Sequence, residues 1–207
     1  MDVEFVSRTA PNEKATVLAE APGVTRLVKV SCHKDPAWSL ELLQRAAPTV
    51  ERLSVGHPQE AHLLAVHAMP RLRRLHVMMG ADADLDAPPV VLPALPPGHA
   101  GLQCLTVSRL PRATTQSLLL AHGRALEELQ LWVGTAGSLA WPRSCGDLHS
   151  LLEQCGLRAL RRLVLVRAHK FSHETAACGE QLAEVRRLLP SAEVLCDVCD
   201  SVEVDEV

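Results

Sequence analysis

The stretch Leu126-Glu-Glu-Leu129-Gln-Leu131 decides the fold of this chain, because its spacing returns four more times along the sequence. An apolar residue is followed by two variable residues, a second apolar residue, one variable residue and a third apolar residue. The last two apolar side chains are two positions apart, as in a strand that buries one face. Each phrase therefore predicts a strand whose last two apolar residues point into a core. The other four copies are residues 50–55, 72–77, 102–107 and 160–165.

Two weaker copies, at residues 25–30 and 191–196, flank these five. The copies start at residues 25, 50, 72, 102, 126, 160 and 191, so the intervals are 25, 22, 30, 24, 34 and 31 residues. The segments between copies carry apolar residues one, three and four positions apart, and Gly or Pro follows them, which is typical of helices. The predicted helices are residues 38–47, 60–68, 114–122, 146–155 and 174–189.

The repeated phrase resembles the leucine-rich-repeat family in its ribonuclease-inhibitor-like form, over roughly residues 24–199. That resemblance implies an α/β leucine-rich-repeat solenoid of about 6–7 strand–helix repeats. Its parallel sheet would line the concave side, and its helices would lie on the convex side. The composition agrees with such thin aliphatic layers, because aromatic residues make up 2% of the chain.

The repeat divides the chain into an N-terminal cap over residues 1–23, a repeat domain over 24–199 and an acidic tail over 200–207. A Pro-rich loop at 82–100 and an insertion at 134–145 interrupt the repeats. The cap shows no helical pattern, so we expect Val3, Phe5 and Val6 to cover the first core layer as an edge strand. If they leave it open, a homodimer through a solenoid end is the alternative.

Composition excludes several classes of partner and compartment. The net charge is −3 and no clustered basic face is evident, so we expect no nucleic-acid partner. No run of 18 apolar residues occurs, so we expect no membrane partner. Without a signal peptide, a cytoplasmic or nuclear location follows. The seven cysteines are odd in number, which argues against a disulfide framework.

The cysteine and histidine spacings give weak signals for chemistry. Cys196 and Cys199 have C-x-x-C spacing, but a zinc site usually takes four ligands and no second pair with this spacing exists. His169 and His173 are four apart, yet the metalloprotease helix needs a Glu where Lys170 stands. We therefore expect no metal ligands and no cofactor, with a metal- or redox-active role for Cys196 and Cys199 kept as the alternative.

The sequence carries no nucleotide-binding or nucleophile-elbow motif, and no nucleophile, base and orienting residue converge. We therefore predict that the chain is not an enzyme. His57, His62 and His67 are five apart, which does not keep them on one helix face, so we interpret them as surface or boundary residues.

The strand positions that point away from the core are the candidate binding surface. Trp, Met and Arg, which are enriched in protein interfaces, occur among them. We therefore predict a non-enzymatic scaffold that binds a protein partner through its concave face; a self-associating assembly factor is another alternative. The candidate protein-binding residues are Arg52, Arg74, His76, Met78, Glu128, Gln130, Trp132, Arg162 and Val164.

Proline two residues before a strand phrase, as at Pro48 and Pro70, resembles the repeat regions of F-box adaptor proteins. That resemblance implies substrate recognition for a ubiquitin ligase. An F-box is a helical segment that docks on the ligase core, and the residues before the first repeat show no such helices. We therefore expect that the chain has either lost that segment or lacks it by origin, and the ubiquitin-ligase role is expected only if the F-box resemblance holds.

Overall fold

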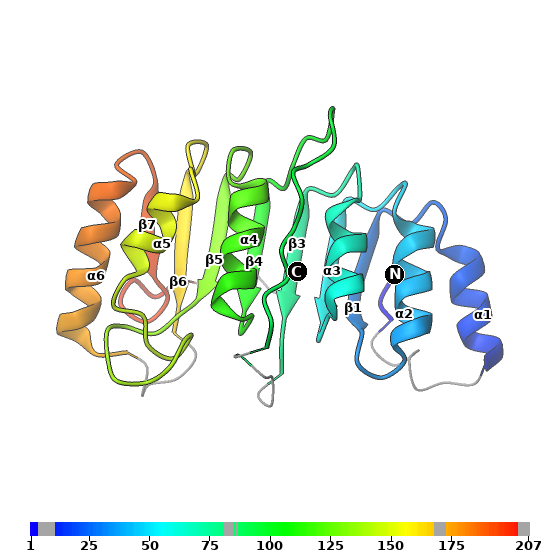
Figure 1. Ribbon diagram of the computed structural model, residues 1–207, viewed down its shortest axis with the longest axis horizontal. Coiled ribbons are helices and arrows are strands. Elements are labelled where there is room, and N and C mark those ends of the chain that lie inside the picture. The colour runs from blue at the N-terminus through cyan, green and yellow to red at the C-terminus, as the bar shows by residue number, and fades with distance from the viewer. Residues whose placement is uncertain (4–10, 81–84, 86, 168–172, 203–207) are drawn as a thin grey trace.

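The computed structural model describes residues 1–3, 11–80, 85, 87–167 and 173–202. These residues form one parallel sheet of seven strands alternating with helices, so the predicted α/β class is confirmed. The strand order in the sheet follows the chain from one edge to the other (Figure 1). The strands are β1 (Arg26–Ser31), β2 (Arg52–Gly56), β3 (Arg74–Met78), β4 (Cys104–Ser108), β5 (Glu128–Trp132), β6 (Arg162–Val166) and β7 (Glu193–Cys196).

The helices lie together on one face of the sheet, and the opposite face carries none of the described helices (Figure 1). We call that opposite face the open face. Five of the helices match the predicted segments to within three residues at each end. The helices are α1 (Pro11–Glu20), α2 (Pro36–Ala46), α3 (Glu60–His67), α4 (Arg112–His122), α5 (Leu148–Gln154) and α6 (Thr175–Leu188).

The core lies between the sheet and the helices and is aliphatic. From β2 to β7, the two residues that the phrase predicts to point inward are buried, as Leu129 and Leu131 are in β5. Parallel pairing puts equivalent residues beside one another, so Leu75, Leu105 and Leu129 form one continuous row. The helix residues that pack on these rows include Leu42, Leu43, Leu63, Val66, Leu118, Leu119, Leu148, Leu151, Leu152, Leu182 and Val185.

In β1 the sequence phrase predicts that Val28 and Val30 point into the core, and this prediction is confirmed for Val30 but wrong for Val28. Leu27 and Val30 belong to the core cluster, whereas Val28 forms a bridge with Asp2. Lys29 has a φ of 59°, and the pairing register with β2 shifts between Leu27 and Val30. The extra residue in this bulge turns the next side chain back to the inner face.

The N-terminal segment contains α1, a helix that the sequence pattern did not predict. None of the residues of α1 is fully buried, so the segment lacks the apolar stripe that marks the other helices. Val3 is buried in the core, and its N–H donates to the Val28 carbonyl at 3.2 Å. This contact covers part of the first core layer; Phe5 and Val6 lie outside the described residues.

The Pro-rich stretch runs as an extended chain, without helix or strand from residue 87 to residue 100. Its backbone is held against α4 by two hydroxyl groups. The N–H of Val90 donates to Thr114 Oγ1 at 3.1 Å, and the N–H of Leu92 donates to Ser117 Oγ at 2.8 Å. Leu92 is buried, so this segment takes the place of a helix in the layer between α3 and α4.

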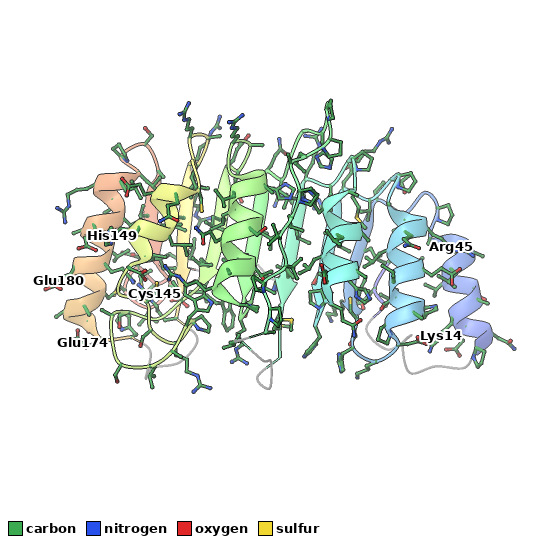
Figure 2. All side chains as sticks on the ribbon, viewed as in Figure 1. Lys14, Arg45, Cys145, His149, Glu174 and Glu180 are labelled. Atoms are coloured by element: carbon green, nitrogen blue, oxygen red, sulfur yellow. The ribbon has the colours of Figure 1, made fainter. Side chains whose placement is uncertain are left out.

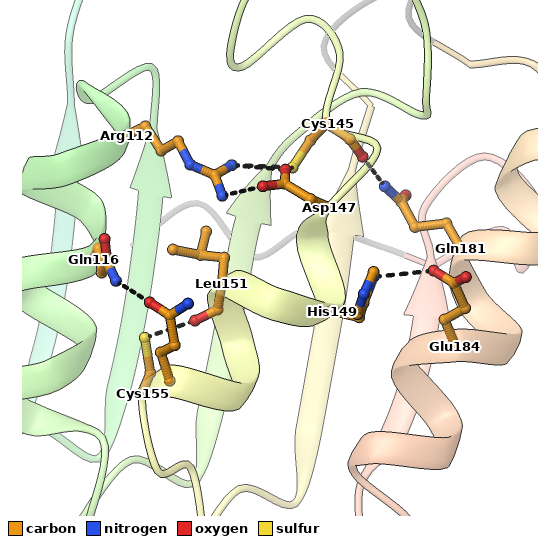
Figure 3. Close-up of polar contacts among 10 residues, drawn as sticks. Arg112, Gln116, Cys145, Asp147, His149, Leu151, Cys155, Gln181 and Glu184 are labelled. Carbon is orange, nitrogen blue, oxygen red and sulfur yellow. Dashed lines mark hydrogen bonds and ion pairs between the residues drawn. The ribbon is translucent and has the colours of Figure 1, made fainter.

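The insertion at 134–145 is fixed between α4 and α6 by polar contacts (Figure 3). Arg112 in α4 forms two charge-assisted hydrogen bonds, of 3.0 and 2.6 Å, with the Asp147 carboxylate just beyond the insertion. Gln181 in α6 donates from Nε2 to the Cys145 carbonyl at 2.6 Å. The three helices of this half of the molecule are thereby tied together by side chains as well as by the core.

Across the described residues, no helix combines the length and the apolar character that crossing a membrane requires.

Candidate functional site

The open face presents its side chains in rows that run across the strands. One row follows the register Arg52, Arg74, Cys104, Glu128, Arg162 and Glu193. The next row contains His76, Thr106, Gln130 and Val164, and a third contains Met78 and Ser108, with Trp132 beside Val166. The structure therefore brings the predicted interface residues onto one surface.

These residues differ in how far solvent reaches them. Arg52, Arg74 and Glu128 are exposed, and Met78 is 42% exposed. The half-buried ones are His76, Gln130, Trp132 and Arg162. Val164 is 2% exposed, so in this structure its side chain is not available to a partner.

The first row carries charges of both signs, with Arg52 and Arg74 at one end and Glu128, Arg162 and Glu193 toward the other. Glu128 accepts a hydrogen bond from the Cys104 thiol at 3.5 Å, and Arg162 lies 3.7 Å from the Glu193 carboxylate. Partial burial, together with the nearby Glu128 carboxylate, raises the pKa of Cys104 to about 11. Cys104 is therefore a neutral thiol at physiological pH and not a reactive thiolate.

A second constellation lies where β7 ends. His173, Cys178, Cys196 and Cys199 place one ligand atom each within 4.8 Å of one another, and we call them the C-terminal Cys/His cluster. His173 Nε2 is 3.1 Å from Cys199 Sγ, and Cys199 Sγ is 3.9 Å from Cys178 Sγ. Within the described residues this is the one group of three or more His, Cys, Asp or Glu side chains that could hold a metal ion.

Local structure explains why these residues meet. Cys178 lies in the first turn of α6, and Glu174, labelled in Figure 2, caps the start of that helix. The Glu174 carboxylate accepts from the N–H groups of Ala176 and Ala177. Cys196 is the last residue of β7, and the turn that follows brings Cys199 back beside it.

A carboxylate fixes that turn. Asp200 accepts from the Cys196 N–H at 2.8 Å, and the Asp200 N–H donates to the Cys196 carbonyl at 2.9 Å. The C-x-x-C segment is thus a closed loop that holds both sulfur atoms on the same side as α6.

The electrostatics of the cluster are uneven. Burial raises the pKa of Cys178 to about 12. Burial acts in the same direction on Cys196, but hydrogen bonds from the backbone N–H groups of Cys199 and Val198 and from Arg167 outweigh it and lower the pKa of that thiol. Burial and then the nearby Cys196 raise the pKa of Cys199 as well, so Cys196 is the one of the three thiols most disposed to ionise.

The spacing of residues in the sequence did not predict that these four side chains lie together. Cys196 and Cys199 were recognised as a C-x-x-C pair, but the search for a second such pair missed His173 and Cys178, which are five residues apart. We expected no metal ligands because Cys196 and Cys199 alone supply two of the four that a zinc site usually takes. The structure brings four candidate ligands together. His169, the other histidine considered, lies outside the described residues.

Of the three histidines interpreted as surface or boundary residues, His57 is half-buried, as predicted, whereas the prediction was wrong for His62 and His67. His62 and His67 are 1% and 4% exposed. His62 Nε2 lies 2.9 Å from Ser39 Oγ, and His67 Nδ1 lies 3.2 Å from Nε2 of the buried His122. Each ring finds a polar partner on a neighbouring element, which a helix pattern taken alone does not reveal.

Comparisons of the chain with protein-family models, with curated proteins and with solved structures find no match.

Proposed function

We propose that the chain is a leucine-rich-repeat solenoid that binds another protein through its open face, without catalysing a reaction. The observation that carries this proposal is the register-aligned row of charged side chains across the uncovered face of the sheet. Stacked repeats of this kind use their strand face as an extended binding surface.

The chemistry of the open face supports a protein as the occupant. Arg74, Glu128 and Arg162 supply charges of both signs, and Met78 and Trp132 supply accessible apolar surface beside them. Such a mixture of charges with Met, Trp and Arg is typical of protein interfaces. A polyanion would instead call for a row of one sign.

The experiment compares two variants that each reverse two arginines and truncate one apolar side chain. The open-face variant is Arg74→Glu, Arg162→Glu and Trp132→Ala. The control variant, Arg158→Glu, Arg187→Glu and Leu120→Ala, changes exposed residues outside the open face. Circular dichroism and thermal unfolding establish that both remain folded. Partners of the wild-type chain are identified by quantitative affinity purification, and their dissociation constants are measured with purified proteins.

We expect the open-face variant to weaken a partner's binding by at least about tenfold, because a central interface residue contributes more than about 1 kcal/mol. The control variant should bind as the wild type does. A partner that both variants bind equally well would show that the open face is not the binding surface.

The finer role implied by the F-box resemblance, substrate recognition for a ubiquitin ligase, stays a prediction. A ubiquitin-ligase subunit that co-purifies with both variants, together with a substrate that the open-face variant alone loses, would support it.

A further inference from the structure

We propose that His173, Cys178, Cys196 and Cys199 bind one Zn²⁺ ion that holds the end of the sheet together. This inference concerns a site away from the open-face row and is independent of the function proposed above. Three cysteines and one histidine are a ligand set that structural zinc sites use. Thiolate and imidazole ligands disfavour Mg²⁺ and Ca²⁺, which prefer oxygen.

The distances fit a tetrahedral ion. Zinc–sulfur bonds of about 2.3 Å place two sulfur atoms about 3.8 Å apart in a regular tetrahedron. Cys199 Sγ and Cys178 Sγ are 3.9 Å apart, and all four ligand atoms lie within 4.8 Å of one another. Because the four ligand atoms lie within 4.8 Å of one another, small side-chain movements would bring all of them to bonding distance from one ion.

The surroundings supply further support through hydrogen bonds. The Asp200 carboxylate accepts from the Cys196 N–H at 2.8 Å and fixes the turn that carries Cys196 and Cys199. Hydrogen bonds outside the coordination shell orient metal ligands in this way. On the other side, Cys178 lies in the first turn of α6, where the helix dipole also favours a thiolate.

Charge balance involves Arg167, which is 5% exposed. Its guanidinium donates to the Val133 carbonyl at 2.7 Å, to Gln181 Oε1 at 2.9 Å and to Cys178 Sγ at 3.3 Å. None of the ion pairs that the described residues form includes Arg167. A buried cation is stabilised by anions nearby, and the Asp197 carboxylate, which accepts from the backbone N–H of Arg167 at 3.0 Å, is one such anion. Three thiolates, one neutral imidazole and Zn²⁺ sum to one negative charge, which Arg167 would neutralise.

The ion would link the start of α6 to the end of β7, two segments that are separated in the sequence by the length of α6. His173 and Cys178 stand at the start of that helix, and Cys196 and Cys199 stand at the end of β7. Among the described strands β7 pairs with β6 alone, so the cross-link would fasten a strand that has one described neighbour.

The test uses the full chain purified under reducing conditions from cells grown with added zinc. Metal content is measured by inductively coupled plasma mass spectrometry, and zinc affinity by competition with a chromophoric chelator. Cobalt(II) added to the metal-free chain reports thiolate ligands and tetrahedral geometry through its visible absorption. The ligand variants are Cys199→Ser, whose side chain is exposed, and His173→Gln, whose side chain is half-buried. The matched control is Cys155→Ser, a cysteine of another element whose Sγ donates to the Leu151 carbonyl (Figure 3).

We expect one zinc per wild-type chain and a visible spectrum typical of tetrahedral cobalt with thiolate ligands. Each ligand variant should lose zinc affinity by at least about 100-fold, which exceeds the usual effect of substituting residues outside the coordination shell. The control should keep its zinc. Three outcomes would overturn the proposal. They are the absence of both bound zinc and a cobalt spectrum, retention of zinc by both ligand variants, and a Cys178–Cys199 disulfide found by peptide mass mapping of the reduced preparation.

Discussion

At the scale of single residues, the buried histidine pair has the clearest consequence for solution behaviour. The backbone N–H of Leu102 donates to Nδ1 of His122 at 3.3 Å, so that nitrogen carries no proton and Nε2 faces His67. Burial lowers the pKa of His122 to about 3, and the neighbouring rings of His67 and His99 act in the same direction. The folded chain therefore keeps this ring neutral at pH values where the unfolded chain protonates it.

The expected result is a loss of stability on mild acidification. Between pH 6.5 and about 3 the unfolded state binds one more proton at this site than the folded state. The free energy of unfolding therefore decreases as the pH is lowered through that window. His122 alone should lower it by about 2 kcal/mol between pH 7 and pH 5. Urea unfolding at both pH values, with EDTA present to remove metal effects, measures the difference.

The His122→Gln variant should show a pH difference that is smaller by about that amount, although its stability at pH 7 is also reduced. The control is His57→Asn, at a residue outside the pair whose φ of 54° asparagine tolerates. If His122→Gln keeps the full pH difference, His122 is not the group responsible.

The C-terminal Cys/His cluster shows why a site of this kind is hard to predict from sequence. Its ligands come from a helix start and a strand end, and no single element carries more than two of them. The spacing of Cys196 and Cys199 was visible, but the approach of His173 depends on how α6 packs against β7. A search for any His or Cys pair near the C-x-x-C, at any spacing, would have found it.

At the scale of elements, strands were predicted better than helices for a physical reason. Each strand places two apolar residues into the core, and the same phrase returns in each repeat, as at Leu129 and Leu131. Helix α1 has no fully buried residue, so nothing in its pattern separates it from a loop. The bulge in β1 was likewise invisible, because a single residue at positive φ leaves the apolar spacing almost unchanged.

The contact between α4 and the end of α5 depends on one glycine. A Cβ at Gly123 would overlap the carbonyl oxygen of Cys155 and approach that of Leu119, both of them backbone atoms. Gly123→Ala should therefore destabilise the chain by about 1–3 kcal/mol, as overpacking in a well-filled core does. Equilibrium unfolding in urea measures the change.

Gly179 in α6 provides the matched substitution. A Cβ there meets nothing within 4 Å, and the position is exposed. Gly179→Ala should stabilise the chain by about 0.5–1 kcal/mol, because alanine loses less backbone entropy in a helix. Equal effects of the two substitutions would mean that the close approach at Gly123 does not limit the packing of α4 against α5.

At the scale of the whole molecule, the described strands contact their neighbours in the sequence, and the ends of the sheet lie far from one another (Figure 1). Stability in such an array is carried from neighbour to neighbour. We therefore expect Leu27→Ala in β1 to speed amide hydrogen exchange mainly in β1 and the helices beside it, while β6 keeps its protection.

Leu129→Ala in the interior strand β5 removes a side chain of the same size and full burial, but β5 has strands on both sides. It should cost about 2–5 kcal/mol and speed exchange in strands on both sides of β5. Hydrogen exchange followed by mass spectrometry distinguishes the two patterns. An identical, uniform rise in both variants would show that the chain unfolds as a single cooperative unit.

The extended Pro-rich segment between α3 and α4 bears on the curvature of the sheet. Strands are spaced about 4.8 Å apart, whereas helices with their side chains are about 10 Å wide, so a layer of helices on one face forces the sheet to bend away from it. Where residues 87–100 replace a helix with an extended chain, the two layers have nearly the same width. We therefore expect the sheet to bend less between β3 and β4, where Arg74 pairs with Cys104, than between strands that a helix connects.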